Sequence, residues 1–489
     1  RAAEAAGWAI IQPERNRELA ELAVETTGLG NVADKIIKNH RKTLGLLRDI
    51  DGVSTFGVIR EDPINGITEI ARPKGVVGAI VPSTNPAATP ANNIINALKC
   101  GNALVVAPSP KGVACCERLV SFIHAEFTKI GEDPELVQMV PAPGSKEKTQ
   151  RLMESCDMVV ATGSQNNVHR AQTSGTPAIA VGAGNVTVIV DETADLSAAA
   201  EKIRASKTFD NATSCSSENS VVVVEAVRDD FIKAMQAAGG ALVEDEAAIL
   251  RALWPDGQLN RAVIGQDADQ MIAALGLEGS VPEGTEYIVV PTENIGPNHP
   301  LSGEKLSRVL ALYTARDFED AVRVTHKIQS RQGAGHSVGL HSNNTDRPIK
   351  LARAIPTSRV IVNQAHCFAT GGAFNNGMPF SLSMGCGSWG GNSIDDNVHW
   401  KHFMQTTKII REKVARLNER KLESGPLLHI SVFALAPIPL LVYFGSCLSN
   451  KIPTQFFQRH RDTERWQWKK RGKSTSYQCS ILRKGTESD

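Results

Sequence analysis

The feature that most constrains the fold is a regular alternation of short apolar runs and longer amphipathic segments between residues 76 and 161. Apolar runs of this length are predicted as buried strands, and the segments between them as helices. The predicted strands are 76–81, 103–107, 136–140 and 157–161, and the predicted helices are 87–98 and 111–130. Strands that alternate with helices indicate an α/β fold with a doubly wound parallel sheet.

The segments around this sheet predict further elements. Before it we expect helices at 16–27 and 31–48, then a hairpin of strands 55–60 and 67–72, because Asn65-Gly66 is a strong turn signal. From about residue 206 a second α/β segment begins, with helices near 229–238, 244–254 and 317–329. A strand is expected near 398–410.

Composition narrows the class of protein. With 489 residues, 42% of them hydrophobic, the chain can bury two or three cores. A net charge of +1 gives no reason to expect nucleic acid as a partner. The nine cysteines show no CxxC spacing, so we predict no metal site and a reducing, cytoplasmic location. The start of the chain shows no signal-peptide pattern.

The last part of the chain, 421–489, has an atypical composition. An apolar run at 427–445 is followed by a basic segment, an order that also occurs in membrane anchors. Pro437 and Pro439 interrupt this run, which argues against a membrane helix. An anchor, an ordinary extension and a segment translated out of frame remain alternatives.

Cys215 stands out among the cysteines. It lies in a small, polar segment that leads into the apolar run 221–224, whereas a packing cysteine is expected among apolar neighbours. A thiol with an ordinary pKa of about 8.5 is only a few per cent thiolate at neutral pH, yet it adds readily to carbonyl carbons. We therefore predict that Cys215 is a nucleophile, and that the other cysteines are buried.

The sequence Ser206-Lys-Thr-Phe-Asp-Asn211 ahead of Cys215 resembles the nucleophile region of the CoA-acylating aldehyde dehydrogenases. The resemblance extends over residues 10–415. Its other motifs are Pro73-Lys-Gly-Val-Val-Gly-Ala-Ile-Val-Pro-Ser-Thr-Asn-Pro86, Ala161-Thr-Gly-Ser164, Ser174-Gly-Thr-Pro-Ala178, Val181-Gly-Ala-Gly-Asn185, Glu304-Lys-Leu-Ser307 and Gly385-Cys-Gly-Ser-Trp-Gly-Gly-Asn-Ser393.

This resemblance implies an aldehyde dehydrogenase-like fold and four regions. Residues 1–205 would form an NAD(P)-binding domain that includes a hairpin arm near 54–72, and 206–395 a catalytic domain. Residues 396–420 would form a return segment and an oligomerisation strand, and 421–489 the atypical tail. In the resembled family a similar ribbon serves oligomer contacts, so a homodimer or homotetramer is expected.

The resemblance also implies roles for two further residues. Asn85 matches the asparagine whose amide, with the backbone N–H of the nucleophile, holds the oxyanion of the thiohemiacetal. Glu304 matches the glutamate that hydrogen-bonds the nicotinamide ribose. A plain Asn-Pro turn and a surface glutamate at a helix start are the alternatives.

The predicted cofactor is NAD(P), although the sheet lacks the usual dinucleotide fingerprint. The chain's G-x-G-x-x-G, Gly385 to Gly390, neither follows a predicted strand nor opens a helix. Candidate cofactor residues are Ser109, Lys111, Thr162, Gly163, Ser164, Gly182 and Glu304. For Thr162 to Ser164 a plain helix cap is the alternative. Lys111 could bind the 2′-phosphate of NADP or a phosphate of coenzyme A, and a solvent-exposed lysine at a helix start is the alternative.

The residue at position 181 indicates which nucleophile removes the acyl group from the enzyme. Hydrolytic aldehyde dehydrogenases carry at this position a glutamate that activates water, and valine accepts no proton. The resemblance therefore implies that coenzyme A, rather than water, takes the acyl group. Small aldehydes and coenzyme A are the predicted partners.

Around Cys215 and at 363–377 the chain looks most like the sulfoacetaldehyde-specific acylating enzymes. A sulfonate needs a cation or several N–H donors. Arg359, His366 and the backbone of Gly371 and Gly372 are the predicted substrate-binding groups, and a purely structural role is the alternative for Arg359. An acylating enzyme for acetaldehyde, propionaldehyde or succinate semialdehyde is one alternative. A catalytically inactive homologue that serves as a binding or scaffold protein is another.

Overall fold

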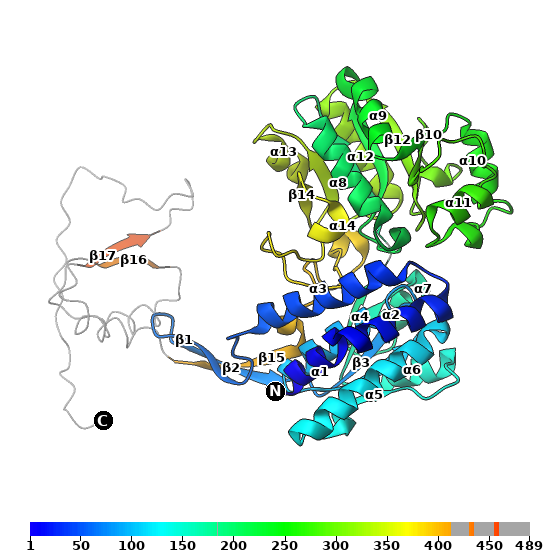
Figure 1. The fold of residues 1–489 in the computed structure, drawn as a ribbon. Coiled ribbons are helices and arrows are strands. Elements are labelled where there is room, and N and C mark those ends of the chain that lie inside the picture. Colours follow the sequence, from blue (N-terminus) through cyan, green and yellow to red (C-terminus); the bar gives the residue numbers. More distant parts are fainter. Residues whose placement is uncertain (183, 412–429, 435–453, 459–489) are drawn as a thin grey trace, which may run out of the picture. The chain divides into compact units, whose positions relative to one another are not determined.

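The computed structural model describes residues 1–182, 184–411, 430–434 and 454–458 (Figure 1). The chain begins with three helices, α1 (Ala2–Ile11), α2 (Pro13–Thr27) and α3 (Val32–Ile50). The side chain of Asn31 caps α3 by accepting a hydrogen bond from the Asp34 backbone N–H at 2.9 Å. Helices α2 and α3 were predicted, whereas α1 was missed because its alanine-rich sequence has little periodic contrast.

The predicted parallel sheet is confirmed. Its strands are β3 (Val76–Val81), β4 (Ala103–Pro108), β5 (Val137–Met139), β6 (Met158–Thr162) and β7 (Ala178–Val181), in the order β5-β4-β3-β6-β7 with every pair parallel. The connecting helices are α4 (Ala88–Lys99), α5 (Val113–Ile130), α6 (Lys146–Ser155) and α7 (Gln165–Gln172).

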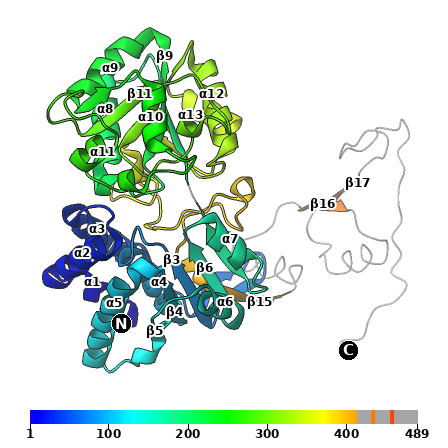
Figure 2. The ribbon, with the colours of Figure 1, turned by 90° about the vertical axis from the view of Figure 1, so that its right-hand side faces the viewer.

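Both faces of this sheet are covered, as its uninterrupted apolar strands require. On one face, Ala79 and Val160 belong to the core formed with α1, α4 and α5. On the other face, Ile80 and Ala161 pack with apolar residues of α6 and α7. Figure 2 shows these helices around the labelled strands β3, β4 and β6.

A second parallel sheet has seven strands in the order β10-β11-β12-β9-β8-β13-β14. They are β8 (Val186–Val190), β9 (Glu218–Val224), β10 (Gly240–Leu242), β11 (Tyr287–Pro291), β12 (Val309–Ala315), β13 (Val338–His341) and β14 (Val360–Val362). The accompanying helices are α8 (Leu196–Thr208), α9 (Arg228–Ala237), α10 (Glu246–Leu253), α11 (Ala268–Ala274), α12 (Phe318–Arg331), α13 (Arg347–Ala354) and α14 (His366–Ala369).

The change from one sheet to the other corrects the boundary expected at 205/206. Strand β8 pairs with β9 and β13, and α8 packs against α9. Both elements therefore belong with the second sheet, and the change lies between Val181 and Val186. The sequence did not reveal this because β8 is as apolar as the strands of the first sheet.

The chain divides into two units, residues 1–57 with 71–406 and residues 58–70 with 407–489. A three-stranded sheet joins β1 (Gly57–Asp62), β2 (Ile67–Pro73) and β15 (Met404–Ile410) in the order β1-β2-β15. Strand β15 starts at Met404 rather than near 398, because Trp400–Phe403 form a short 3-10 helix. We call this three-stranded sheet the ribbon.

In the tail, the structure describes two short strands, β16 (Ile430–Ala434) and β17 (Thr454–Gln458), which pair in parallel. Most of the apolar run at 427–445 lies outside the described residues. Among the helices that the structure describes, none has the length and apolar content needed to cross a membrane.

Candidate active site

A cavity of about 310 Å³ lies at the carboxyl ends of β3, β6 and β7. Ligands in open α/β sheets bind at this edge. The cavity also reaches α3 and the segments before β9 and after α14. Its lining includes seven predicted site residues, namely Asn85, Thr162, Gly163, Ser164, Gly182, Cys215 and Glu304.

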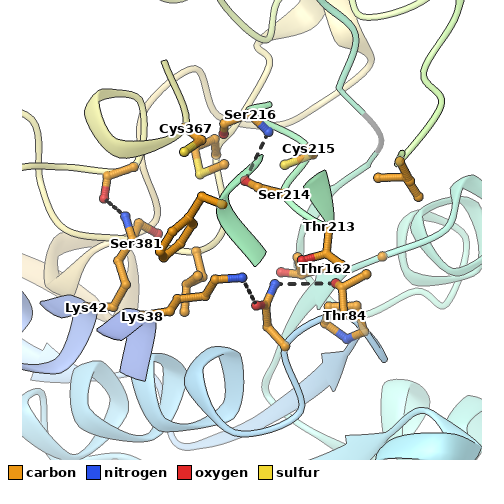
Figure 3. A pocket seen from close by; sticks show the side chains of 18 of the residues that line it. Lys38, Lys42, Thr84, Thr162, Thr213, Ser214, Cys215, Ser216, Cys367 and Ser381 are labelled. Carbon is orange, nitrogen blue, oxygen red and sulfur yellow. Dashed lines mark hydrogen bonds between the residues drawn. The ribbon is translucent and has the colours of Figure 1, made fainter. Parts of the chain in front are cut away.

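Cys215 projects into the cavity from the turn that precedes β9 (Figure 3). Its side chain is partly exposed, whereas the other six cysteines in the described residues are buried. The three residues Asp210, Asn211 and Ala212 have positive φ angles of 47°, 54° and 58°, a conformation that few side chains adopt freely. This strained run sets the direction in which the cysteine segment enters the cavity.

A close contact with the backbone at Gly184 supports the turn that carries Cys215. A Cβ added at Gly184 would overlap the carbonyl oxygen of Cys215 and come within 3.2 Å of His336 Nε2. Only glycine fits there without moving the cysteine. Asn185, the next residue, donates from Nδ2 to the carbonyl oxygens of Ser302 at 2.9 Å and Gln332 at 3.2 Å. The 184–185 backbone is therefore a fixed support for Cys215.

The surroundings disfavour the thiolate. Burial, and then the nearby Glu304, raise the pKa of Cys215 to about 12. Burial also raises the pKa of Glu304 to about 8. Near neutral pH and without ligands, both groups are therefore protonated.

The orientation of Asn85 is fixed by Lys38, a residue whose role the sequence pattern did not indicate. Lys38 Nζ donates to Asn85 Oδ1 at 2.8 Å and also pairs with Asp210. An ammonium group has no acceptor, so the amide oxygen must face Lys38 and the amide N–H groups must face away from it. Asp210 also pairs with Lys35 at 3.2 Å, and one carboxylate thus faces two ammonium groups.

Helix α3 gives the cavity a basic side. Lys38, Arg41 and Lys42 all line it, because residues three and four apart share one face of a helix. In Figure 3, Lys38, Lys42 and Ser381 lie on one side, and Thr84 and Thr162 on the other. The signal for this face was present as lysines at 35, 38 and 42 within a predicted helix. It was not used, because a basic helix face is usually exposed.

On the side of the first sheet, Thr162, Gly163 and Ser164 form the link from β6 to α7. Gly163 has a φ of 154°, which favours glycine, so bare backbone borders the cavity there. The side chain of Ser164 caps α7 by accepting from the Asn167 N–H at 3.4 Å. The helix-cap interpretation and the cofactor interpretation of this segment are thus compatible.

Two predicted cofactor residues do not border the cavity. Lys111 Nζ points to the carbonyl oxygen of Thr27 at 3.5 Å. Ser109 follows β4, and its hydroxyl is buried without a hydrogen-bond partner among the described residues. Glu304 does border the cavity, and it lies in a loop rather than at the start of a surface helix.

The two side chains predicted to bind the substrate also lie away from the cavity. Arg359 is buried, and its guanidinium donates to Asn397 Oδ1 at 3.0 Å and to the carbonyl oxygens of His336 and Gly385 at 2.9 and 2.8 Å. His366 is buried with Nε2 2.8 Å from Ser337 Oγ. Burial holds the pKa of His366 well below its usual range. Arg359 thus holds the return segment in place, and the neutral His366 supplies no cation.

The sequence and the fold correspond to those of one enzyme family. Residues 8–397 match the model of the aldehyde dehydrogenase family, and the chain belongs to this family. Residues 410–489 match a second model, described as the SMODS-associated and fused to various effectors sensor domain.

Three similar proteins indicate to which branch of the aldehyde dehydrogenase family the chain belongs. The chain is 58% identical to a sulfoacetaldehyde dehydrogenase (acylating) from Cupriavidus necator, over 83% of each chain. It is 38% identical to a succinate-semialdehyde dehydrogenase (acetylating) from Clostridium kluyveri, over 80% of this chain and 86% of the relative. A solved propionaldehyde dehydrogenase from Rhodopseudomonas palustris, with bound CoA and an acylated cysteine, has a TM-score of 0.75 at 26% identity. That match covers 84% of this chain and 91% of the solved chain. The chain is an acylating aldehyde dehydrogenase.

Proposed function

We propose that this protein oxidises sulfoacetaldehyde to its acyl-CoA with NAD(P)⁺, through a thioester on Cys215. The placement of Cys215 and Asn85 in one cavity is the observation that carries the proposal. The 58% identity to a sulfoacetaldehyde dehydrogenase (acylating) supports the substrate. An inactive homologue would have no need of a nucleophile, an oriented amide and a supporting glycine at one site.

Cys215 is the proposed nucleophile. Its sulfur forms a bond to the aldehyde carbon, the carbonyl π electrons move to oxygen, and the thiol proton passes to solvent. The Asn85 amide N–H and the backbone N–H of Cys215 then donate to the oxyanion. Because Lys38 holds Asn85 Oδ1, the amide offers its donor rather than its acceptor.

The cofactor is proposed to bind along Thr162, Gly163, Ser164 and Gly182, with Glu304 at the ribose. The fit is supported by the bare backbone at Gly163, which lets a planar group approach closely. Bound NAD(P)⁺ supplies the hydride acceptor. On this account, residues up to Val181 form the cofactor domain, and those from Val186 to 395 form the catalytic domain. Ser109 and Lys111 do not line the cavity, so they could contact only a part of the cofactor that extends beyond it.

The acceptor of the acyl group is proposed to be coenzyme A. Val181 is an apolar side chain with 3% of its surface exposed, so it cannot activate a water molecule. A thiol attacks the thioester carbon, the new C–S bond forms, and Cys215 leaves as the thiol after it regains a proton. The propionaldehyde dehydrogenase with bound CoA and an acylated cysteine supports this route.

Succinate semialdehyde is a second candidate substrate. The basic side of the cavity suits a carboxylate as well as a sulfonate. One relative, 38% identical, bears the name of such an enzyme.

The cytoplasmic location stays a prediction from the pattern of cysteines.

The test is a steady-state assay with sulfoacetaldehyde, succinate semialdehyde and acetaldehyde, with each cofactor and coenzyme A. Sulfoacetaldehyde should give the highest kcat/KM, and acyl-CoA should form in step with the reduced cofactor. The Cys215→Ala variant should lose all turnover while it still binds the cofactor. Activity above a few per cent in that variant would disprove the assignment of the nucleophile.

A further inference from the structure

Arg41 is a cation whose role the proposed mechanism leaves open. It lines the cavity that holds Cys215, and no hydrogen bond or ion pair to it is found within the described residues. Its guanidinium carbon lies over the ring of Phe368, 4.7 Å from the ring centre. A cation–π contact of this kind uses the charge of the guanidinium and occupies none of its five N–H donors in a hydrogen bond.

Lys42, the next residue, is buried at the same side of the cavity. Its ammonium group donates to the carbonyl oxygen of Gly371 and lies 5.7 Å from the centre of the Phe380 ring. An ammonium group has three N–H donors, and this carbonyl oxygen takes one of them. Ser381 borders the cavity on the same side in Figure 3, but its hydroxyl already donates to the carbonyl oxygen of Ser383 at 3.0 Å.

The charges around the cavity are not balanced. Lys35 and Lys38 share the single carboxylate of Asp210. Glu304 is the one acidic residue among those that line the cavity, and it is largely protonated near neutral pH. Lys38 and Arg41 therefore give the cavity an excess of positive charge, and Lys42, whose pKa burial lowers to about 7, adds a partial positive charge near neutral pH. A cavity of this kind favours an anionic ligand.

We infer that Arg41, with Lys42 beside it, binds the anionic group of the aldehyde substrate and determines its specificity. This inference rests on the proposed function and assigns the recognition of the sulfonate, first expected at Arg359 and His366. The planar fork of a guanidinium matches two sulfonate oxygens, and such charge-assisted pairs are the strong ones. Arg359 cannot compete, because its donors are already bound to Asn397, His336 and Gly385.

The phosphates of the cofactor or of coenzyme A are the other anions that this cavity meets. In Figure 3, Lys42 of α3 lies across the cavity from Thr162, whereas Lys38 reaches Asn85, which in turn donates to Thr84 Oγ1 at 3.4 Å. The proposed cofactor residues Thr162, Gly163 and Ser164 lie on the side of the first sheet. Arg41 and Lys42 are thus the basic residues left for the aldehyde.

The test compares Arg41→Met and Arg41→Lys with the wild type. Arg48→Met is the matched control, since Arg48 lies on the same helix, is exposed, and does not line the cavity. The readouts are kcat/KM for sulfoacetaldehyde and for propionaldehyde, KM for coenzyme A, and inhibition by the unreactive sulfonate isethionate. Thermal melting checks that each variant is folded.

We expect Arg41→Met to lower kcat/KM for sulfoacetaldehyde about 100-fold and to weaken isethionate inhibition, with propionaldehyde changed less than about 3-fold. The kcat/KM of Arg41→Lys for sulfoacetaldehyde should lie between those of Arg41→Met and the wild type. Arg48→Met should match the wild type. Equal losses for both aldehydes, or a raised KM for coenzyme A alone, would overturn the inference. A wild type that does not prefer sulfoacetaldehyde would instead contradict the proposed substrate. In that case, an Arg41-dependent preference for succinate semialdehyde would still support the anion site.

Discussion

At the scale of single residues, the proposed reaction depends on hydrogen-bond donors that are held in place before the substrate arrives. Asn85 is oriented by Lys38, which pairs with Asp210 just ahead of the cysteine segment. The same aspartate accepts from Thr213 Oγ1 at 2.7 Å. The oxyanion donor and the nucleophile are thus tied to one buried carboxylate, which links their positions.

The Asn85→Ala variant should lower the rate of the chemical step by about 10² to 10³, because one oxyanion donor is lost. Lys38→Met should cause a smaller loss, because the amide remains but can rotate. Single-turnover formation of reduced cofactor measures both effects, and cofactor affinity should change little. An unchanged single-turnover rate in Asn85→Ala would refute its role.

The raised pKa of Cys215 gives a prediction about pH. Only the thiolate reacts with iodoacetamide, and a pKa of about 12 means that the thiolate fraction is still rising well above pH 9. The rate of alkylation of the ligand-free enzyme should therefore increase about tenfold per pH unit from pH 7 to 9. Mass spectrometry locates the label, and Cys215→Ala is the control. A plateau below pH 8 would show that the thiolate is stabilised rather than disfavoured.

At the scale of elements, the sequence predicted β3, β4 and β6 with their helices well, because apolar strands and amphipathic helices alternate there. It placed Cys215, Asn85 and Thr162 correctly at strand ends or just before a strand, although only the fold brings them together. The basic face of α3 was not foreseen, because burial of Lys38 and Lys42 depends on contacts with Asp210 and Gly371, far away in the sequence. The sequence left a structural role of Arg359 open, because its partners Asn397 and Gly385 are equally distant along the chain.

The close contact between the 184–185 backbone and the cysteine turn can be tested by a single methyl group. Gly184→Ala would force the carbonyl group of Cys215 to move, so we expect a loss of activity of at least about 100-fold and a lower melting temperature. Gly377→Ala is the matched control, because no atom lies within 4 Å of its added Cβ. Wild-type kcat in Gly184→Ala would show that the cysteine turn is not fixed by this contact.

At the scale of the whole molecule, the ribbon carries the proposed oligomer contacts. Every residue of β15 after Met404 is exposed, including the apolar Ile409 and Ile410 at 41% and 75% of their surface. Exposed apolar side chains on a sheet with free edges are typical of surfaces that associate. We therefore propose a homodimer or homotetramer that assembles through the ribbon.

Replacing Ile410 by glutamate should shift the protein to a smaller species, because a charge would be buried in the interface. Light scattering coupled to size exclusion measures the mass. Ile349→Glu is the control, since Ile349 is a similarly exposed residue on α13 with 57% of its surface accessible. An unchanged mass for Ile410→Glu, or the same shift in both variants, would contradict a role of the ribbon.

Cys215 is proposed to form a thioester that water does not cleave, because Val181 provides no base. The most direct measurement mixes excess aldehyde and NAD(P)⁺ with enzyme in the absence of coenzyme A and follows the reduced cofactor. We expect a single burst of about one equivalent per active site, an acyl group on Cys215 seen by mass spectrometry, and turnover to acyl-CoA once coenzyme A is added. Continuous turnover to the free carboxylic acid without coenzyme A would contradict this proposal.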